Sequence, residues 1–121
     1  MTITGKCYCG ATTFEIDAAP ASVTSCTCSF CAKTGALWAY YSRAKVRFSS
    51  LEHDQVFAPR VNRHHFCAVC GMTTFSESPT WDLATKTPDF SRTRLGINAR
   101  LFENFDVAAV EHRTIDGRNL W

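Results

Sequence analysis

Hydrophobic and polar residues alternate over short stretches of this chain instead of recurring at helical spacing. Thr12, Phe14 and Ile16 occupy every second position of one such stretch. Gly10 precedes it and Pro20 follows it. Alternation over a few residues between turn-forming residues is typical of a strand that buries one face. The pattern therefore predicts a half-buried strand at this point.

Further short runs are rich in aromatic and β-branched side chains, which pack well on a pleated surface. None of these runs is long enough to predict a helix. They lie at residues 37–41, 46–48, 55–57, 73–75 and 95–97. Together with the first strand, they predict a mainly β fold built from short strands.

Two segments lack this alternation. Polar residues dominate residues 77–93, and Pro79 and Pro88 interrupt any regular period there. We therefore expect mostly loop in this segment, with no more than a short helical turn. Residues 98–110 mix short apolar pairs with polar residues, and this pattern fits either a short helix or another strand.

Composition narrows the class of protein. A length of 121 residues suits one domain, so we treat residues 1–121 as a single unit. Hydrophobic residues make up 45% and charged residues 20%, which is enough apolar material for a packed core. The net charge of +2 and the lack of a long apolar run argue against nucleic-acid and membrane partners. We expect a globular cytoplasmic protein, and the sequence carries no signal for its oligomeric state.

Cysteine spacing carries the strongest chemical signal. Disulfides are rare in reducing compartments, and an odd number of cysteines cannot all pair, so metal binding is the better interpretation. A CxxC pair followed by glycine suits a metal-binding turn, because both sulfurs can face one ion. All seven cysteines fall in three motifs, CxC at Cys7 and Cys9, CxCxxC at Cys26, Cys28 and Cys31, and CxxCG at Cys67 and Cys70.

The three motifs predict a division into four and three ligands. A structural zinc site usually has four ligands, so the CxxC pair needs a second pair, and the CxC pair is the candidate. The remaining CxCxxC motif holds three sulfurs within six residues. A three-ligand site leaves one position open for water or for a substrate atom.

Other uses of these cysteines fit the three motifs less well. Seven buried core cysteines would seldom fall into such motifs, and a redox pair of the thioredoxin type expects a βαβ context that is missing here. An iron–sulfur cluster stays open, because four thiolates also suit it. His64 or His65 could complete the three-ligand site, but alternation along a strand would point them to opposite faces, so at most one of them could do so.

The motifs together resemble the glutathione-dependent formaldehyde-activating enzyme family, which includes centromere protein V. The resemblance rests on GxCxCG at Gly5 to Gly10, on the central CxCxxC, on FCxxCG at Phe66 to Gly71, and on the closing residues Asp116 to Trp121. It implies an Mss4-like fold of short antiparallel strands organised around zinc-binding knuckles, with two Zn²⁺ ions per chain. It also implies that Cys7, Cys9, Cys67 and Cys70 hold a structural zinc ion, and that Cys26, Cys28 and Cys31 hold a catalytic one.

The activity that this resemblance implies is the addition of glutathione to formaldehyde, a carbon–sulfur bond reaction classed with the lyases. Three thiolates and Zn²⁺ sum to a charge of −1, which makes the ion a weak activator of water and suits a thiol substrate. The predicted function is therefore a carbon–sulfur lyase acting on a glutathione-like thiol and a small aldehyde. The alternatives are a non-catalytic zinc module that binds a thiol or a protein partner, and a module in which both zinc sites are structural.

Residues that could surround the open site are suggested only by sequence proximity. Lys33, Arg43 and Arg63 are candidates to offset its negative charge, although solvated surface positions are the simpler interpretation. Trp38, Tyr40 and Tyr41 are candidates to line a pocket beside it, with core packing as the simpler interpretation.

Overall fold

The computed structural model describes residues 1–59, 61–82 and 84–120, and most of its regular secondary structure consists of strands in two sheets. The smaller sheet has three antiparallel strands in the order β1-β2-β5. Its strands are β1 (Ile3–Lys6), β2 (Thr12–Ile16) and β5 (Val46–Leu51). The burial of β2 alternates along the strand, which confirms the half-buried strand predicted from the sequence.

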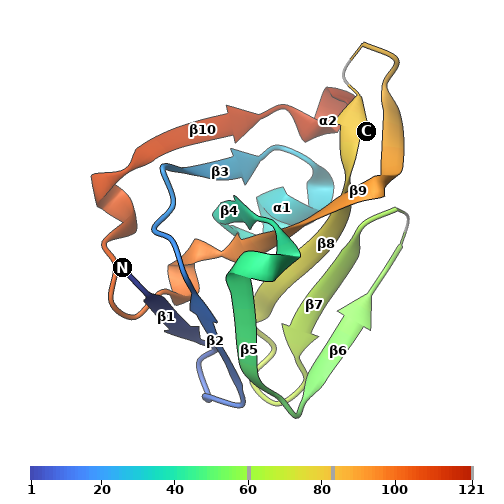
Figure 1. Ribbon diagram of the computed structural model, residues 1–121. Helices are drawn as coiled ribbons and strands as arrows, with labels where there is room; N and C mark the ends of the chain where they lie inside the picture. Colours follow the sequence, from blue (N-terminus) through green and yellow to red (C-terminus); the bar gives the residue numbers. More distant parts are fainter. Residues whose placement is uncertain (60, 83, 121) are drawn as a thin grey trace.

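The larger sheet has seven strands in the order β10-β3-β4-β9-β8-β7-β6. Neighbours are antiparallel except for β10 and β3, which run parallel. In Figure 1 these two strands lie along the top of the molecule and β6 lies at the lower right. The strands are β3 (Ser22–Cys26), β4 (Trp38–Tyr41), β6 (Asp54–Phe57), β7 (Arg63–Cys67), β8 (Thr73–Asp82), β9 (Thr87–Asn98) and β10 (Glu111–Ile115).

Among the described residues, helical structure is limited to short segments between strands and after the last strand. α1 (Ser29–Thr34) follows β3, and α2 (Gly117–Leu120) follows β10. Single 3₁₀ turns occupy Arg43–Lys45, Ala99–Leu101 and Val107–Ala109. Residues 98–110 thus form two 3₁₀ turns, which is neither of the alternatives left open by the sequence. No helix in the described ranges is long and apolar enough to cross a membrane.

The expectation that residues 77–93 form a loop is wrong. The long hairpin of β8 and β9 runs through this segment and reaches the upper right of Figure 1. Pro79 pairs with Thr93 at a shift of register, a place where a strand tolerates the missing N–H of proline. The polar side chains that suggested a loop lie on the exposed outer part of the hairpin.

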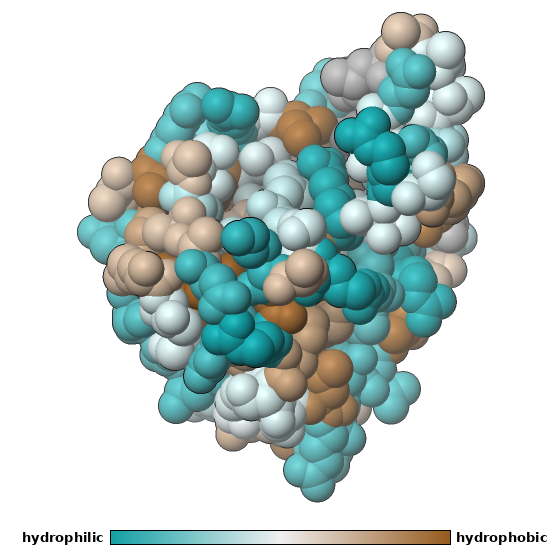
Figure 2. Space-filling view, in the orientation of Figure 1, coloured by the Kyte–Doolittle hydropathy of each residue, from teal (hydrophilic) through white to brown (hydrophobic). Residues whose placement is uncertain are grey.

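The main core lies between the two sheets. Strand alternation sends one set of side chains from β8 and β9 into this core and the other set to the opposite face of the larger sheet. Hydrophilic and hydrophobic residues are mixed over the face shown in Figure 2. The buried core residues are Ile3, Phe14, Ile16, Val46, Phe75, Leu95 and Ile97.

Candidate functional site

Two turns bring four cysteines together between the sheets. Cys7 and Cys9 lie in the turn between β1 and β2, Cys67 ends β7, and Cys70 lies in the turn between β7 and β8. Their sulfur atoms all lie within 4.8 Å of one another. We call these residues the four-cysteine cluster, and it connects a hairpin of the smaller sheet to one of the larger sheet.

The two turns of the four-cysteine cluster have the same construction. The N–H of Gly10 donates to the carbonyl of Cys7 at 3.1 Å, and the N–H of Gly71 donates to that of Cys67 at 2.8 Å. Both glycines have positive φ, 82° and 76°, which side chains disfavour. A tetrahedral metal ion fits such a set, because each turn presents two sulfurs to one point and none of the four is in a disulfide.

Three more cysteines form a second group at the start of α1. Cys26 ends β3, Cys28 caps the helix and Cys31 lies inside it. Their sulfurs also lie within 4.8 Å of one another. We call them the three-cysteine cluster. No histidine or carboxylate of the described residues joins this group, so the chain supplies three ligand atoms here.

N–H groups point at the sulfurs of the three-cysteine cluster. The backbone N–H of Cys31 donates to Cys28 Sγ at 3.4 Å, and the indole N–H of Trp38 donates to Cys31 Sγ at 3.3 Å. The hydrogen bond from Cys31 lowers the pKa of Cys26 to about 5, and the same bond raises the pKa of Cys31. The cluster therefore holds negative charge at neutral pH, as a cation site requires.

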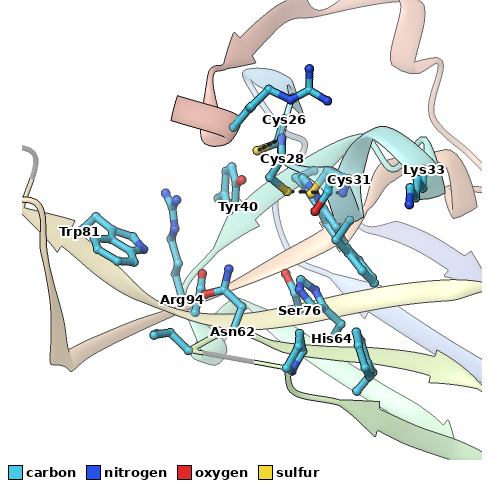
Figure 3. A pocket seen from close by; sticks show the side chains of 18 residues that line it. Cys26, Cys28, Cys31, Lys33, Tyr40, Asn62, His64, Ser76, Trp81 and Arg94 are labelled. Atoms are coloured by element: carbon cyan, nitrogen blue, oxygen red, sulfur yellow. Dashed lines mark hydrogen bonds between the residues drawn. The ribbon is translucent and has the colours of Figure 1, made fainter. Parts of the chain in front are cut away.

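A cavity of about 980 Å³ opens beside the three-cysteine cluster. Its floor is formed by residues that pair with one another across neighbouring strands of the larger sheet. The paired positions run across five strands, from β4 through β9, β8 and β7 to β6. Figure 3 shows the cysteines on one side of the cavity and Ser76 and His64 facing them. We call this the floor row, and its residues are Tyr40, Gly96, Ser76, His64 and Phe57.

Small residues keep the centre of the floor row open. A Cβ atom placed on Gly96 would lie 3.0 Å from Ser76 Oγ and 3.2 Å from Tyr40 Cε1. It would also lie 3.3 Å from Trp38 Cε3, tighter than ordinary van der Waals contact. A larger residue at this position would therefore press on the side chains of Ser76, Tyr40 and Trp38.

Comparison with known proteins identifies the family of this chain. A model of the family described as glutathione-dependent formaldehyde-activating enzyme matches residues 2–102. The chain belongs to this family. The match includes all seven cysteines and every strand except β10.

A solved structure supports the fold of this family member. A crystal structure of a Rhodobacter sphaeroides protein is similar to the chain, with a TM-score of 0.70 and 26% sequence identity. The similarity covers 94% of this chain and 99% of that one. A search of curated proteins finds no match. The predicted family and its mainly β, Mss4-like fold are thereby confirmed.

The predicted cysteine grouping agrees with the geometry. The sulfurs expected to form the structural site lie together, and so do those expected to form the open site. Both clusters could hold metal ions, as the family implies. The CxxC turn joins two antiparallel strands, so it lacks the βαβ context of a thioredoxin-type redox pair. An iron–sulfur cluster is an alternative that sulfur positions alone do not separate from zinc.

The histidine pair divides between the two faces of the sheet, as alternation along a strand predicts. His64 lines the cavity and stacks on Phe30 of α1, with the ring centroids 3.8 Å apart. His65 lies on the other face, where Nδ1 is 2.7 Å from Asp54 and Nε2 is 3.1 Å from Glu77. Neither one joins the three-cysteine cluster.

The candidate cations beside the open site are only partly supported. Lys33 lines the cavity. Arg43 and Arg63 instead form ion pairs with Glu77 and are exposed, which agrees with the simpler interpretation that they are surface charges. Proximity in sequence did not predict their position, because both side chains pair with Glu77, which faces away from the cavity. Arg94 and Arg118 line the cavity and were missed.

Two of the three candidate aromatic residues line the cavity. Trp38 and Tyr40 lie on its floor, whereas Tyr41 points to the opposite face and donates to the carbonyl of Ala18. Alternation along β4 separates Tyr41 from its neighbours. Alternation along β9 was the sequence signal for Arg94. Arg94 lies two positions before Gly96, so both residues face the cavity side of the sheet.

Proposed function

We propose that this protein is a zinc-dependent carbon–sulfur lyase that adds a thiol such as glutathione to a small aldehyde such as formaldehyde, or cleaves that adduct. The single observation that carries the proposal is the three-cysteine cluster, which opens onto a cavity large enough for a peptide-sized substrate. Family membership supports the same reaction class. We also propose that residues 1–121 act as one domain. We further propose a cytoplasmic location, because the free cysteines of the protein suit a reducing compartment.

Each cysteine cluster has a distinct proposed role. Cys7, Cys9, Cys67 and Cys70 would hold a structural zinc ion with no vacant position, whereas Cys26, Cys28 and Cys31 would hold the catalytic one. When bound there, zinc supplies a coordination position for a substrate sulfur and favours its thiolate form. Three thiolates are electron-rich ligands, so this site suits a sulfur substrate better than the activation of water.

The proposed reaction is an addition that needs no oxidant or reductant. The thiol loses its proton, and the sulfur forms a bond to the carbonyl carbon of the aldehyde. The π electrons of the C=O bond move to the oxygen, which takes up one proton. The product is a hemithioacetal, in which the sulfur and a hydroxyl group share the former carbonyl carbon, and the reverse sequence cleaves it.

Residues around the three-cysteine cluster would position the reactants. The N–H of Trp38 holds the Cys31 sulfur, and the rings of Trp38 and Tyr40 keep water from the cavity floor. Burial raises the pKa of Tyr40 to about 12, so its hydroxyl keeps its proton and stays a hydrogen-bond donor. Lys33 offsets part of the negative charge of the cysteines.

Turnover by the zinc-loaded protein tests this proposal. Exchange of ¹³C-formaldehyde into its thiol adduct is followed by NMR with glutathione and with other thiols. We expect a rate above the uncatalysed one, lost in Cys28→Ala and kept in Ser42→Ala, which changes an exposed residue outside the cavity. No acceleration with any thiol–aldehyde pair would overturn the enzyme, and thiol binding without turnover would favour the non-catalytic module.

A further inference from the structure

The last part of the chain returns to the three-cysteine cluster. β10 runs parallel to β3, and the register places Ile115 opposite Cys26. Figure 1 shows β10 beside β3, with α2 at the end of β10. This segment lies beyond residues 2–102, which the family model matches. We call residues 115–118 the C-terminal clamp, because they hold the residues described next.

Thr27, the residue between the first two cysteines of the cluster, makes three hydrogen bonds to the C-terminal clamp. Its backbone N–H donates to the carbonyl of Ile115 at 3.0 Å. Its hydroxyl donates to Asp116 Oδ1 at 2.8 Å and accepts the backbone N–H of Arg118 at 3.3 Å. The backbone and the side chain of Thr27 are both fixed in this way. The directions in which the two neighbouring cysteines project are therefore fixed as well.

The C-terminal clamp also points a backbone N–H at a cysteine sulfur. Gly117 is buried, and its N–H donates to Cys26 Sγ. The hydrogen bond from Cys31 is the main cause of the lowered pKa of Cys26, and the N–H of Gly117 lowers that pKa further. An N–H that faces a thiolate stabilises its negative charge and fixes its orientation. The clamp therefore contacts one candidate ligand directly and the residue beside it through three hydrogen bonds.

Asp116 is itself held in place. The side-chain amide of Asn119 donates to Oδ2 at 2.6 Å, while Oδ1 accepts from Thr27. The hydrogen bonds from Asn119 and Thr27 lower the pKa of Asp116, so its carboxylate stays an acceptor at neutral pH. The contact with Asn119 serves the start of α2, whereas the contact with Thr27 joins positions 89 residues apart. A local role at the chain end leaves this second contact unexplained.

We infer that the C-terminal clamp positions the ligands of the open metal site, with Asp116 and Gly117 acting through Thr27 and Cys26. The CxCxxC motif brings three sulfurs near one another, and the clamp fixes the direction of the first two. This inference rests on the proposed function only in taking the three-cysteine cluster as a metal site. It adds that the end of the chain, together with the motif, sets the affinity and the geometry of that site.

Binding of Co²⁺ tests the inference, because Co²⁺ replaces Zn²⁺ at thiolate sites and its absorption reports the coordination geometry. Thr27→Val removes the hydroxyl and keeps the shape of the side chain, and Asp116→Ala removes the acceptor of that hydroxyl. We expect both variants to bind Co²⁺ about tenfold more weakly at the three-cysteine cluster, with unchanged affinity at the four-cysteine cluster.

Two further variants are the controls for the loss of the hydroxyl. Thr27→Ser keeps a hydroxyl at the same position and should restore the wild-type affinity. Thr114→Val removes a hydroxyl that lies 3.4 Å from the hydroxyl of Ser25, between the same two strands. It should leave Co²⁺ binding unchanged. Weakening by Thr114→Val equal to that by Thr27→Val would overturn the assignment of Thr27.

The N–H of Gly117 is tested separately. Gly117 is the first residue of α2, a position that tolerates proline, so Gly117→Pro removes the N–H and keeps the helix. Gly117→Ala keeps the N–H and is the matched control. We expect Gly117→Pro to weaken Co²⁺ binding about fivefold and to shift the sulfur-to-cobalt charge-transfer band to lower energy, because Cys26 loses a donor. Equal affinities and spectra in these two variants would overturn the role of this N–H.

Turnover and Co²⁺ binding together separate this inference from the proposed function. Turnover by the wild type, with Co²⁺ affinity unchanged in Thr27→Val and Asp116→Ala, would overturn the inference and keep the enzyme. Weaker Co²⁺ binding in these variants, with no turnover by the wild type, would overturn the enzyme and keep the inference. Equal weakening at both cysteine clusters would indicate a general loss of stability, and it would also overturn the inference.

Discussion

The indole N–H of Trp38 donates to the sulfur of Cys31 at 3.3 Å, from the floor of the cavity to the wall that carries the cysteines. Trp38 is 3% exposed, so this hydrogen bond is shielded from water. A donor that faces a thiolate stabilises its charge and fixes the direction of its lone pairs. Trp38 therefore connects the β-sheet to the candidate metal ligands.

Trp38→Phe should weaken metal binding at the three-cysteine cluster. Loss of such a supporting hydrogen bond typically lowers metal affinity by about tenfold or more. Competition with a chromophoric chelator measures the affinity. Tyr41→Phe is the control, since it removes a hydrogen bond from the same strand on the opposite face. Equal affinities in wild type and Trp38→Phe would contradict a supporting role for the indole.

Chelation should remove two metal ions in two stages. The three-cysteine cluster has fewer protein ligands and lines an open cavity, so its ion should leave first and the fold should remain. Loss of the second ion should unfold the chain, because the four-cysteine cluster joins the two sheets. Metal analysis and circular dichroism, recorded during titration with a chelator, follow both events.

Cysteine variants check the order of metal loss. Cys28→Ala should retain about one ion and a folded structure, whereas Cys67→Ala should lower the melting temperature sharply. Unfolding of Cys28→Ala with a stable Cys67→Ala would reverse the proposed roles of the two clusters.

Gly96→Ala should narrow the cavity. The new methyl group would press on Trp38 and Tyr40, and overpacking of this kind typically costs about 1–3 kcal/mol. We expect weaker binding of S-methylglutathione and a lower melting temperature. Adding Ser76→Gly removes the closest atom and should recover part of the loss. Unchanged binding in Gly96→Ala would show that the floor row does not contact the substrate.

Glu77 should stabilise the fold in a pH-dependent way. Burial tends to raise its pKa, but hydrogen bonds from His65 and Arg43 outweigh burial and lower it below 4.5. A lowered pKa gives stability that is fully present above pH 4.5 and is lost as the pH falls through the folded-state value. Glu77→Gln should therefore cost about 1–3 kcal/mol at neutral pH and progressively less in acid.

Urea unfolding between about pH 7 and about pH 3 measures this difference. Glu103→Gln is the control, because Glu103 forms an exposed ion pair with Lys6. Comparing each variant with the wild type at the same pH removes the shared effect of metal loss in acid. A penalty for Glu77→Gln that stays constant with pH would contradict the assigned interaction.

Local spacing made the cysteine clusters predictable, because two or three residues of separation already bring sulfurs within reach of one ion. Counting ligands also predicted that Cys7 and Cys9 lie beside Cys67 and Cys70, and the structure agrees. That these cysteines bind zinc stays a prediction. The mainly β fold could likewise be predicted from a local pattern, the alternation of hydrophobic and polar residues.

The cavity could not be predicted, because its residues meet through the pairing of strands distant in sequence. Tyr40 and His64 share one row only after three intervening strand pairings are known. The β8–β9 hairpin was missed because its outer part is polar and contains two prolines. The two failures have different causes. Sheet register, which builds the cavity, depends on contacts far from any local pattern, whereas local composition is a poor guide to an exposed strand.

All four residues of the four-cysteine cluster precede position 71, whereas the floor row requires Gly96. During synthesis from the N-terminus, the complete set of four sulfurs exists before β9 has been made. The ligands of the proposed structural ion are therefore all present before the strand that completes the cavity floor has been made.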